Sequence, residues 1–125
     1  MKYLILIYGN PASRAIWEGF SDTQRAEGLA YYAALNDDLV ASGEMIASAA
    51  LADPSLARRV LVREGQTITS DGPFAEVKEH LAGIYLVECE GLERAVEVAA
   101  RVPEAALGLV EVRPVRELDA LEQWS

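Results

Sequence analysis

Residues 70–90 read SDGPFAEVKEHLAGIYLVECE, and the second half of this stretch decides the fold. From Leu81 to Glu88 the side chains are apolar at nearly every position, so both faces of an extended strand would be apolar. A short apolar run of this kind is typical of a strand that is covered on both sides. Residues 2–8, KYLILIY, repeat the pattern near the start of the chain. The sequence therefore predicts two central strands in one sheet.

The other predicted elements surround these two strands. Ser21 and Gln24 have the spacing of a capping box, and Gly43 is placed to end the same helix in a left-handed conformation. The full set comprises a helix from Ser21 to Ser42, a strand over 44–51, an edge hairpin of 59–63 and 67–69, a helix over 92–102 and an edge strand over 109–115 that contains Pro114. The segments Gly9-Asn10-Pro11 and Asp53-Pro54-Ser55 are interpreted as breaks in the chain. The second helix has an apolar stripe of Leu92, Ala95, Val96, Ala99 and Val102, and Pro103 is expected to end it.

The order β-α-β-(hairpin)-β-α-β predicts an α+β fold of the ferredoxin-like type, with an antiparallel sheet and the two doubly apolar strands at its centre. Residues 1–115 form one domain, and residues 116–125 form a tail whose thin apolar stripe is typical of a short helix. Two helices joined by right-handed crossovers cover only one face of such a sheet. Because apolar side chains would remain on the other face, we expect a homodimer, a dimeric α/β barrel with its sheets face to face and a partly apolar cavity near one end.

Charge and composition exclude several classes of function. The chain has 20 acidic and 11 basic residues and a net charge of −9, which disfavours nucleic acid as a partner. The cluster Arg58, Arg59 and Arg63 is interpreted as a solvated face that protects a strand edge. The apolar start is too short for a signal peptide or a membrane span, and a single cysteine cannot form an internal disulfide, so we expect a cytoplasmic protein with no membrane partner.

The tetrapeptide Asp71-Gly72-Pro73-Phe74 has a structural interpretation that needs no activity. Pro73 favours extended geometry at Gly72 and suits the first position of a short helical turn over 75–79. Asp71 would then accept backbone amides at the start of that turn, and Phe74 would pack against the sheet. Cys89, further along, is expected to be a small buried apolar residue.

A functional interpretation rests on His80, because imidazole suits proton transfer near neutral pH. A helical turn would place Glu76 and His80 four residues apart on one face, as a base and the group that orients it. The candidate catalytic residues are Asp71 and His80, and the candidate substrate-binding residues are Tyr8, Phe74, Glu76 and Lys78. The chain shows no zinc-ligand spacing, no glycine-rich phosphate loop and no nucleophile elbow, so no metal or cofactor is expected.

Three segments, MKYLILIYG, DGPFAEVKEHLAGIYLVEC and VEVRPV, resemble the YCII-related proteins, and in particular the branch named for its DGPF tetrapeptide. The resemblance covers residues 1–115 in order. It implies a dimeric α+β barrel and a pocket beside the sheet where a histidine and an aspartate meet. Asp71 lies in the matching motif, whereas the DGPF branch also carries glutamine at the position of His80. The resemblance therefore favours Asp71 and Lys78 over His80 as the residues that the site requires.

The resemblance leaves three functions open. One is a small-molecule enzyme that uses acid/base chemistry at an Asp/His pocket. A second is a non-catalytic binding or regulatory protein, because DGPF genes often lie near sigma factors of the extracytoplasmic-function type. The third, an isomerase or monooxygenase, rests on analogy of fold alone.

Overall fold

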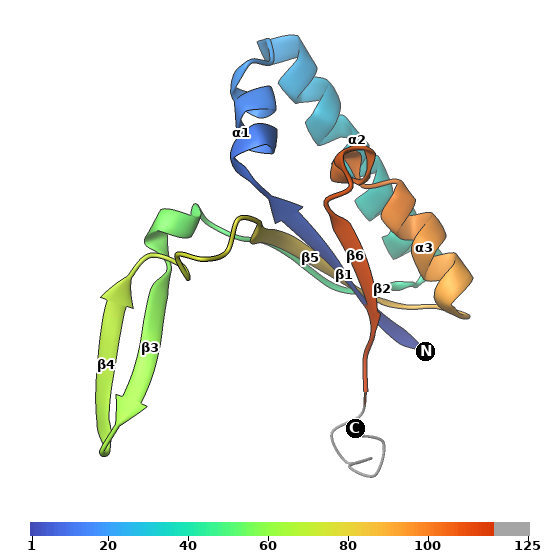
Figure 1. Ribbon diagram of the computed structural model, residues 1–125. Helices are drawn as coiled ribbons and strands as arrows, with labels where there is room; N and C mark the ends of the chain where they lie inside the picture. The colour runs from blue at the N-terminus through green and yellow to red at the C-terminus, as the bar shows by residue number, and fades with distance from the viewer. Residues whose placement is uncertain (117–125) are drawn as a thin grey trace.

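A computed structural model describes residues 1–116 of the chain, and the helix expected in the C-terminal tail lies outside these residues. The main body is a four-stranded antiparallel sheet in the order β2-β5-β1-β6, with helices on one side (Figure 1). Its strands are β1 (Lys2–Gly9), β2 (Met45–Ala50), β5 (His80–Glu88) and β6 (Val110–Pro114). The two doubly apolar segments are the central strands β1 and β5, which confirms the predicted ferredoxin-like arrangement.

Two helices, α2 (Asp22–Ser42) and α3 (Leu92–Ala100), cover the same face of the sheet (Figure 1). Alternate residues of β1 and β5 point toward them, as the two-residue period of a strand requires. The core comprises Tyr3, Ile5, Ile7, Leu35, Leu39, Tyr85, Val87, Cys89, Ala95, Val98, Ala99 and Val102. Cys89 is therefore a buried apolar residue, as predicted.

The bounds of α2 follow from its caps. The Ser21 side chain accepts a hydrogen bond from the Gln24 amide at 3.1 Å, and the Gln24 side chain accepts one from the Ser21 amide at 2.9 Å. Gly43 ends the helix with φ 77°, a left-handed conformation that glycine adopts without a steric penalty. Both signals were read correctly from the sequence.

A further helix, α1 (Pro11–Glu18), was not predicted, because Gly9-Asn10-Pro11 was interpreted only as a break after the first strand. The Asn10 side chain accepts a hydrogen bond from the Ser13 amide at 2.8 Å, and Pro11 occupies the first helical position. The sequence Asn-Pro-Ala-Ser therefore carried a helix-start signal. All residues of α1 are at least partly exposed, so apolar periodicity could not reveal it.

The second predicted helix differs from α3 in its end and in its apolar stripe. Leu92 and Val96, both expected in the stripe, are 53% and 50% exposed, whereas Val98 is buried. Pro103, expected as a stop, begins a short 3-10 helix, η2 (Pro103–Leu107), that leads into β6.

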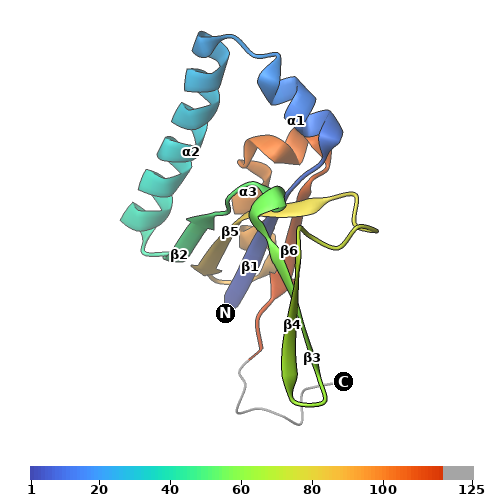
Figure 2. The same ribbon diagram turned by 90° about the vertical axis from the view of Figure 1, so that its left-hand side faces the viewer.

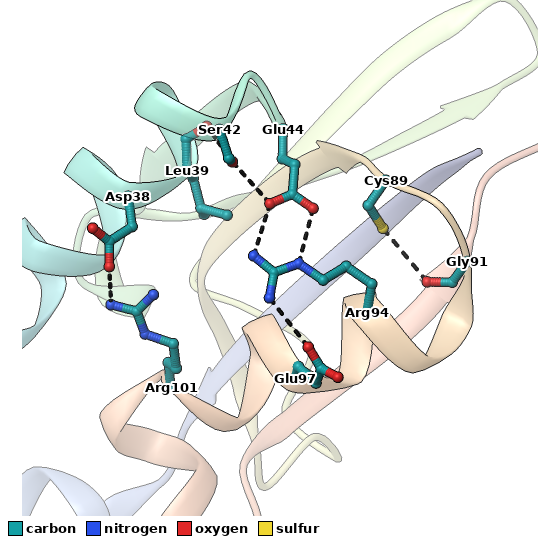
Figure 3. Close-up of polar contacts among 9 residues, drawn as sticks. All are labelled: Asp38, Leu39, Ser42, Glu44, Cys89, Gly91, Arg94, Glu97 and Arg101. Atoms are coloured by element: carbon teal, nitrogen blue, oxygen red, sulfur yellow. Dashed lines mark hydrogen bonds and ion pairs between the residues drawn. The ribbon is translucent and has the colours of Figure 1, made fainter.

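Polar contacts hold the ends of α2 and α3 together (Figure 3). Arg94 on α3 donates two hydrogen bonds to Glu44, which directly precedes β2, at 2.8 and 3.0 Å. Arg101 donates to Asp38 on α2 at 2.6 Å. The two contacts therefore join the C-terminal end of α2 to both ends of α3.

The predicted hairpin forms, but it is not an edge of the main sheet. Strands β3 (Arg58–Arg63) and β4 (Gln66–Asp71) make a separate two-stranded sheet, which follows a short 3-10 helix, η1 (Pro54–Leu56). Figures 1 and 2 show this hairpin standing away from the body, on the side of the main sheet opposite α2 and α3. We call residues 58–71 the β3–β4 arm.

Among residues 1–116, no helix has the length and apolar character needed to cross a membrane.

Candidate functional site

An open groove lies where β2 ends, β5 begins and the β3–β4 arm joins the body. Its volume is about 310 Å³. The lining residues are Leu51, Ala52, Asp53, Pro54, Leu56, Ala57, Pro73, His80 and Leu81. Most of this lining is hydrocarbon, and among the described residues Asp53 and His80 are its only ionisable side chains. The groove therefore combines an apolar surface with one carboxylate and one imidazole.

Local hydrogen bonds fix the Asp53 carboxylate at the start of η1. Its Oδ1 accepts a hydrogen bond from the Ser55 amide at 2.9 Å, and its Oδ2 accepts one from Arg14 Nη2 at 3.0 Å. The bonds to Ser55 and the nearby Arg14 charge lower the pKa of Asp53 below 3.8, so the side chain is a carboxylate at neutral pH. Sequence reasoning treated Asp53-Pro54-Ser55 only as a chain break and missed this residue. Asp before Pro and Ser is, however, a recognisable capping pattern.

His80 is the first residue of β5 and pairs with Gly9 of β1. The side chain is half-buried, and within the described residues its imidazole makes no hydrogen bond. Both ring nitrogens are therefore available to a molecule in the groove. The structure thus places His80 in the groove with Asp53, rather than with Asp71.

Asp71 and Phe74 lie at the base of the β3–β4 arm. The Asp71 carboxylate, 87% exposed, forms an ion pair with Arg58 across the two strands of the arm. The Phe74 ring is 58% exposed and lies under the Arg59 guanidinium, 4.4 Å from the ring centroid. The expectations that Asp71 caps a helical turn and that Phe74 packs against the sheet are therefore wrong.

The helical turn predicted over 75–79 does not form. Gly72 has φ 79° instead of extended geometry, and its amide donates to the Ala57 carbonyl at 2.8 Å, which closes the base of the arm. After this reversal the backbone makes only one tight turn, in which the Val77 amide donates to the Phe74 carbonyl at 3.2 Å. Glu76 therefore does not lie one helical turn from His80 on a common face. Glu76 and Lys78 are both exposed on this loop.

Tyr8 borders a second hollow, of about 290 Å³, at the same end of the sheet. The hollow is lined by Tyr8, Glu79, Gly108, Leu109, Val110 and Glu111. The Tyr8 hydroxyl donates to Glu111 Oε1 at 3.1 Å, and burial together with this contact raises the pKa of Tyr8. The six candidate residues thus occupy the groove, the base of the arm, its adjoining loop and this hollow, and their roles stay predictions.

The face of the main sheet opposite α2 and α3 has an apolar centre. Within residues 1–116, no α-helix covers this face (Figure 2). Leu4 of β1 lies opposite Leu86 of β5, and Leu6 lies opposite Ile84; all four side chains are half-buried. On the edge strand β2, alanines lie beside Leu86 and Ile84. On the other edge strand, β6, the charged residues Arg113 and Glu111 lie beside Leu4 and Leu6. We call this surface the open face.

Within residues 1–116, no group of three or more His, Cys, Asp or Glu side chains has an arrangement that could hold a metal ion. The candidate chemistry of the groove therefore rests on the carboxylate, the imidazole and the apolar wall.

The structure thus defines a ferredoxin-like α+β protein with an open apolar sheet face and a groove that contains a histidine. The sequence matches the YCII-related domain over residues 1–119, and the chain belongs to this family. It is also similar to an uncharacterized protein of Rhizobium meliloti (strain 1021), with 32% identity over 117 residues that cover 92% of each chain.

Proposed function

We propose that the protein is a homodimer that binds a small organic molecule in the groove beside His80. The observation that carries this proposal is the groove itself, which joins an apolar wall to an imidazole that makes no hydrogen bond within residues 1–116. Ligand sites in proteins typically have this composition, with a few polar groups that orient the ligand.

The homodimer is supported by the open face. Its four half-buried aliphatic side chains would each gain about 0.5–1 kcal/mol per protomer when the remaining apolar area is removed from water. A second sheet stacked on this face would cover them, because two sheets pack with their apolar faces together. A protein without such cover would leave a contiguous apolar patch in solvent, which is uncommon in monomers.

The groove favours a ligand that is largely apolar and carries one polar or ionisable group. The hydrocarbon of Leu51, Leu56 and Leu81 would contact the apolar part, and His80 would hydrogen-bond the polar group. Asp53 is already engaged by Ser55 and Arg14, so it supplies a fixed negative charge at one side of the groove.

Acid/base catalysis at His80 is a second candidate function, favoured by the ionised carboxylate of Asp53 in the same groove. In this reaction His80 would take a proton from a bound substrate, and the Asp53 carboxylate would lie in the same groove. A regulatory protein of the DGPF branch, beside an extracytoplasmic-function sigma factor, would use the same binding step without turnover. The assignment to that branch rests on residues 71–74.

The binding proposal is tested by thermal unfolding of the full chain with a library of small organic acids, amines and aromatic compounds. A ligand at a hundred times its dissociation constant adds about 2.7 kcal/mol of stability, which raises the midpoint by about 10 °C for a domain of this size. His80→Ala should reduce the response, while Val96→Ala, on the far side of the sheet, should retain it. The proposal fails if no compound stabilises the protein, or if His80→Ala responds as fully as the control.

Catalysis is tested on the compounds that bind. Turnover that disappears in His80→Ala and persists in Val96→Ala would support the enzyme. If compounds bind but none of them is chemically changed, the enzymatic function is rejected and the non-catalytic binding function is supported.

A further inference from the structure

Within residues 1–116, no other segment buries the strands of the β3–β4 arm. All six residues of β3 and all six of β4 are exposed, although the arm carries several large apolar side chains. These are Val60, Leu61, Val62 and Ile68, which are between 46% and 66% exposed. Leu61 lies directly opposite Ile68, so the two form one apolar pair on one side of the arm.

An isolated two-stranded hairpin of this length is only marginally stable in water. Both strands of the arm are also free edges, and exposed apolar edges tend to pair with other chains. The arm therefore needs cover from outside the described chain.

We propose that the β3–β4 arm packs against the second copy of the chain and acts as a clasp of the homodimer. This inference rests on the dimer of the proposed function, and it identifies a contact surface separate from the open face. The arm stands out on the same side of the main sheet as the open face (Figures 1 and 2). A partner placed on that face would therefore lie beside the arm.

The length of the arm fits this role. Six residues of strand span about 20 Å, whereas two stacked sheets are about 10 Å apart. The arm thus reaches beyond the plane of a partner sheet stacked on the open face, to the flank of the second copy.

The charge of the arm also favours this partner. Residues 58–71 contain three arginines and two carboxylates, a net charge of +1, whereas the whole chain carries −9. The rest of each chain is strongly acidic, so a basic arm is attracted to the body of a second copy. Charged side chains on an edge strand also limit unspecific pairing with the strands of other chains. Arg63 lies near the tip of the arm, two residues beyond Leu61 of the apolar pair.

The arm adjoins the groove, so docking of the arm would also affect the binding site. Ala57 and Pro73 line the groove, and the arm begins and ends one or two residues from them. The Gly72 amide donates to the Ala57 carbonyl, and the Arg58–Asp71 ion pair closes the next rung. A partner that holds the arm would fix these two walls, so the groove would be fully formed only in the dimer.

The first test shortens the arm. Arg59 and Ser70 are opposite each other, so residues 60–69 can be replaced by Asn-Gly, a two-residue turn that closes such a pair. Sedimentation velocity over a concentration series would compare this variant with the full chain. We expect a dimer for the full chain and a dissociation constant raised roughly a hundredfold for the shortened arm.

A pair of point variants supplies the matched control. Leu61→Ser with Ile68→Ser removes the apolar pair of the arm, and Leu92→Ser with Val96→Ser removes a similarly exposed pair from α3. The arm variant should weaken the dimer, and the α3 variant should leave it unchanged. Amide hydrogen exchange of the arm in the unmodified chain should slow as the concentration rises through the dimerisation range.

The outcomes separate the two proposals. If the full chain is a dimer and both arm variants dimerise equally well, the clasp is overturned and the dimer stands. Arm amides that exchange at the rate of a free hairpin in the dimer would overturn the clasp in the same way. If the full chain is a monomer throughout the series, both the dimer and the clasp are overturned.

Discussion

The paired hydrogen bonds between Arg94 and Glu44 should contribute measurably to stability, unlike most ion pairs at protein surfaces. The two bonds are parallel, at 2.8 and 3.0 Å, and the side chains are 33% and 15% exposed (Figure 3). Ser42 donates a further hydrogen bond to Glu44 at 2.8 Å, which also holds the carboxylate in place. This geometry joins the end of α2 and the start of β2 to α3.

The magnitude follows from the burial of the pair. Charge-assisted hydrogen bonds contribute about 1.5–3 kcal/mol when they are shielded, whereas exposed pairs contribute about 0.2–1 kcal/mol. Because Arg94 is about one-third exposed, we expect a coupling energy of about 1–2 kcal/mol. The Arg101–Asp38 pair joins the same two helices but is 42% and 62% exposed, so its coupling should stay below about 0.5 kcal/mol.

Two double-mutant cycles would measure these couplings by urea unfolding at low protein concentration. One cycle uses Arg94→Met and Glu44→Gln, and the control cycle uses Arg101→Met and Asp38→Asn. Equal coupling in the two cycles would refute the reasoning, because burial would then not set the strength of the pair.

The same pair makes stability depend on pH. Hydrogen bonds from Arg94 lower the pKa of Glu44 below its ordinary value of 4.5. A carboxyl whose pKa is lower in the folded state stabilises the protein above the unfolded pKa and loses this contribution as pH falls through the folded pKa. The stability difference between the unmodified chain and Glu44→Gln should therefore be constant near neutrality and shrink below about pH 4.5. A difference that is unchanged down to pH 2 would contradict this assignment.

Three further predictions concern single side chains, each measured by chemical unfolding. Tyr85→Phe should cost about 1 kcal/mol, because the Tyr85 hydroxyl donates to Asn36 Oδ1 at 2.6 Å, while Tyr31→Phe at a 68% exposed position should cost nothing measurable. Gly43→Ala should cost about 1 kcal/mol because of φ 77°, and Gly43→Asn should cost less, since asparagine tolerates left-handed geometry; equal costs would argue against backbone strain. His80→Ala should change the free energy of unfolding by less than about 0.5 kcal/mol, and a larger loss would mean that His80 serves the fold rather than the groove.

Local signals predicted most of the fold correctly. The capping box at Ser21 and the glycine at position 43 set the bounds of α2, because each acts through backbone groups within one turn. The continuous apolar runs in β1 and β5 placed those strands at the centre, where a neighbouring strand on each side shields their side chains from water. The missed helix α1 lacked this pattern, since it packs no fully buried side chain.

The candidate site was harder to predict, because its residues come from distant parts of the chain. Asp53 and His80 line one groove although 27 positions separate them, and the intervening residues leave the body as the β3–β4 arm. The DGPF motif looked like a compact unit, yet Asp71 and Phe74 bind arginines of the arm. The predicted helical turn over 75–79, which would have placed Glu76 beside His80, does not form. At Gly72 the backbone instead turns toward Ala57, and the Gly72 amide donates a hydrogen bond to the Ala57 carbonyl.

The sequence by itself determined the four strands of the main sheet, the helices α2 and α3 between them, the central position of β1 and β5, and the family. These features depend on side-chain periodicity and on caps, which act over a few residues. Only the tertiary structure decided that the hairpin leaves the sheet and that His80 meets Asp53 in a groove. Those arrangements depend on the direction in which the chain turns after each strand. The periodicity of side chains within a strand or helix carries no information about that direction.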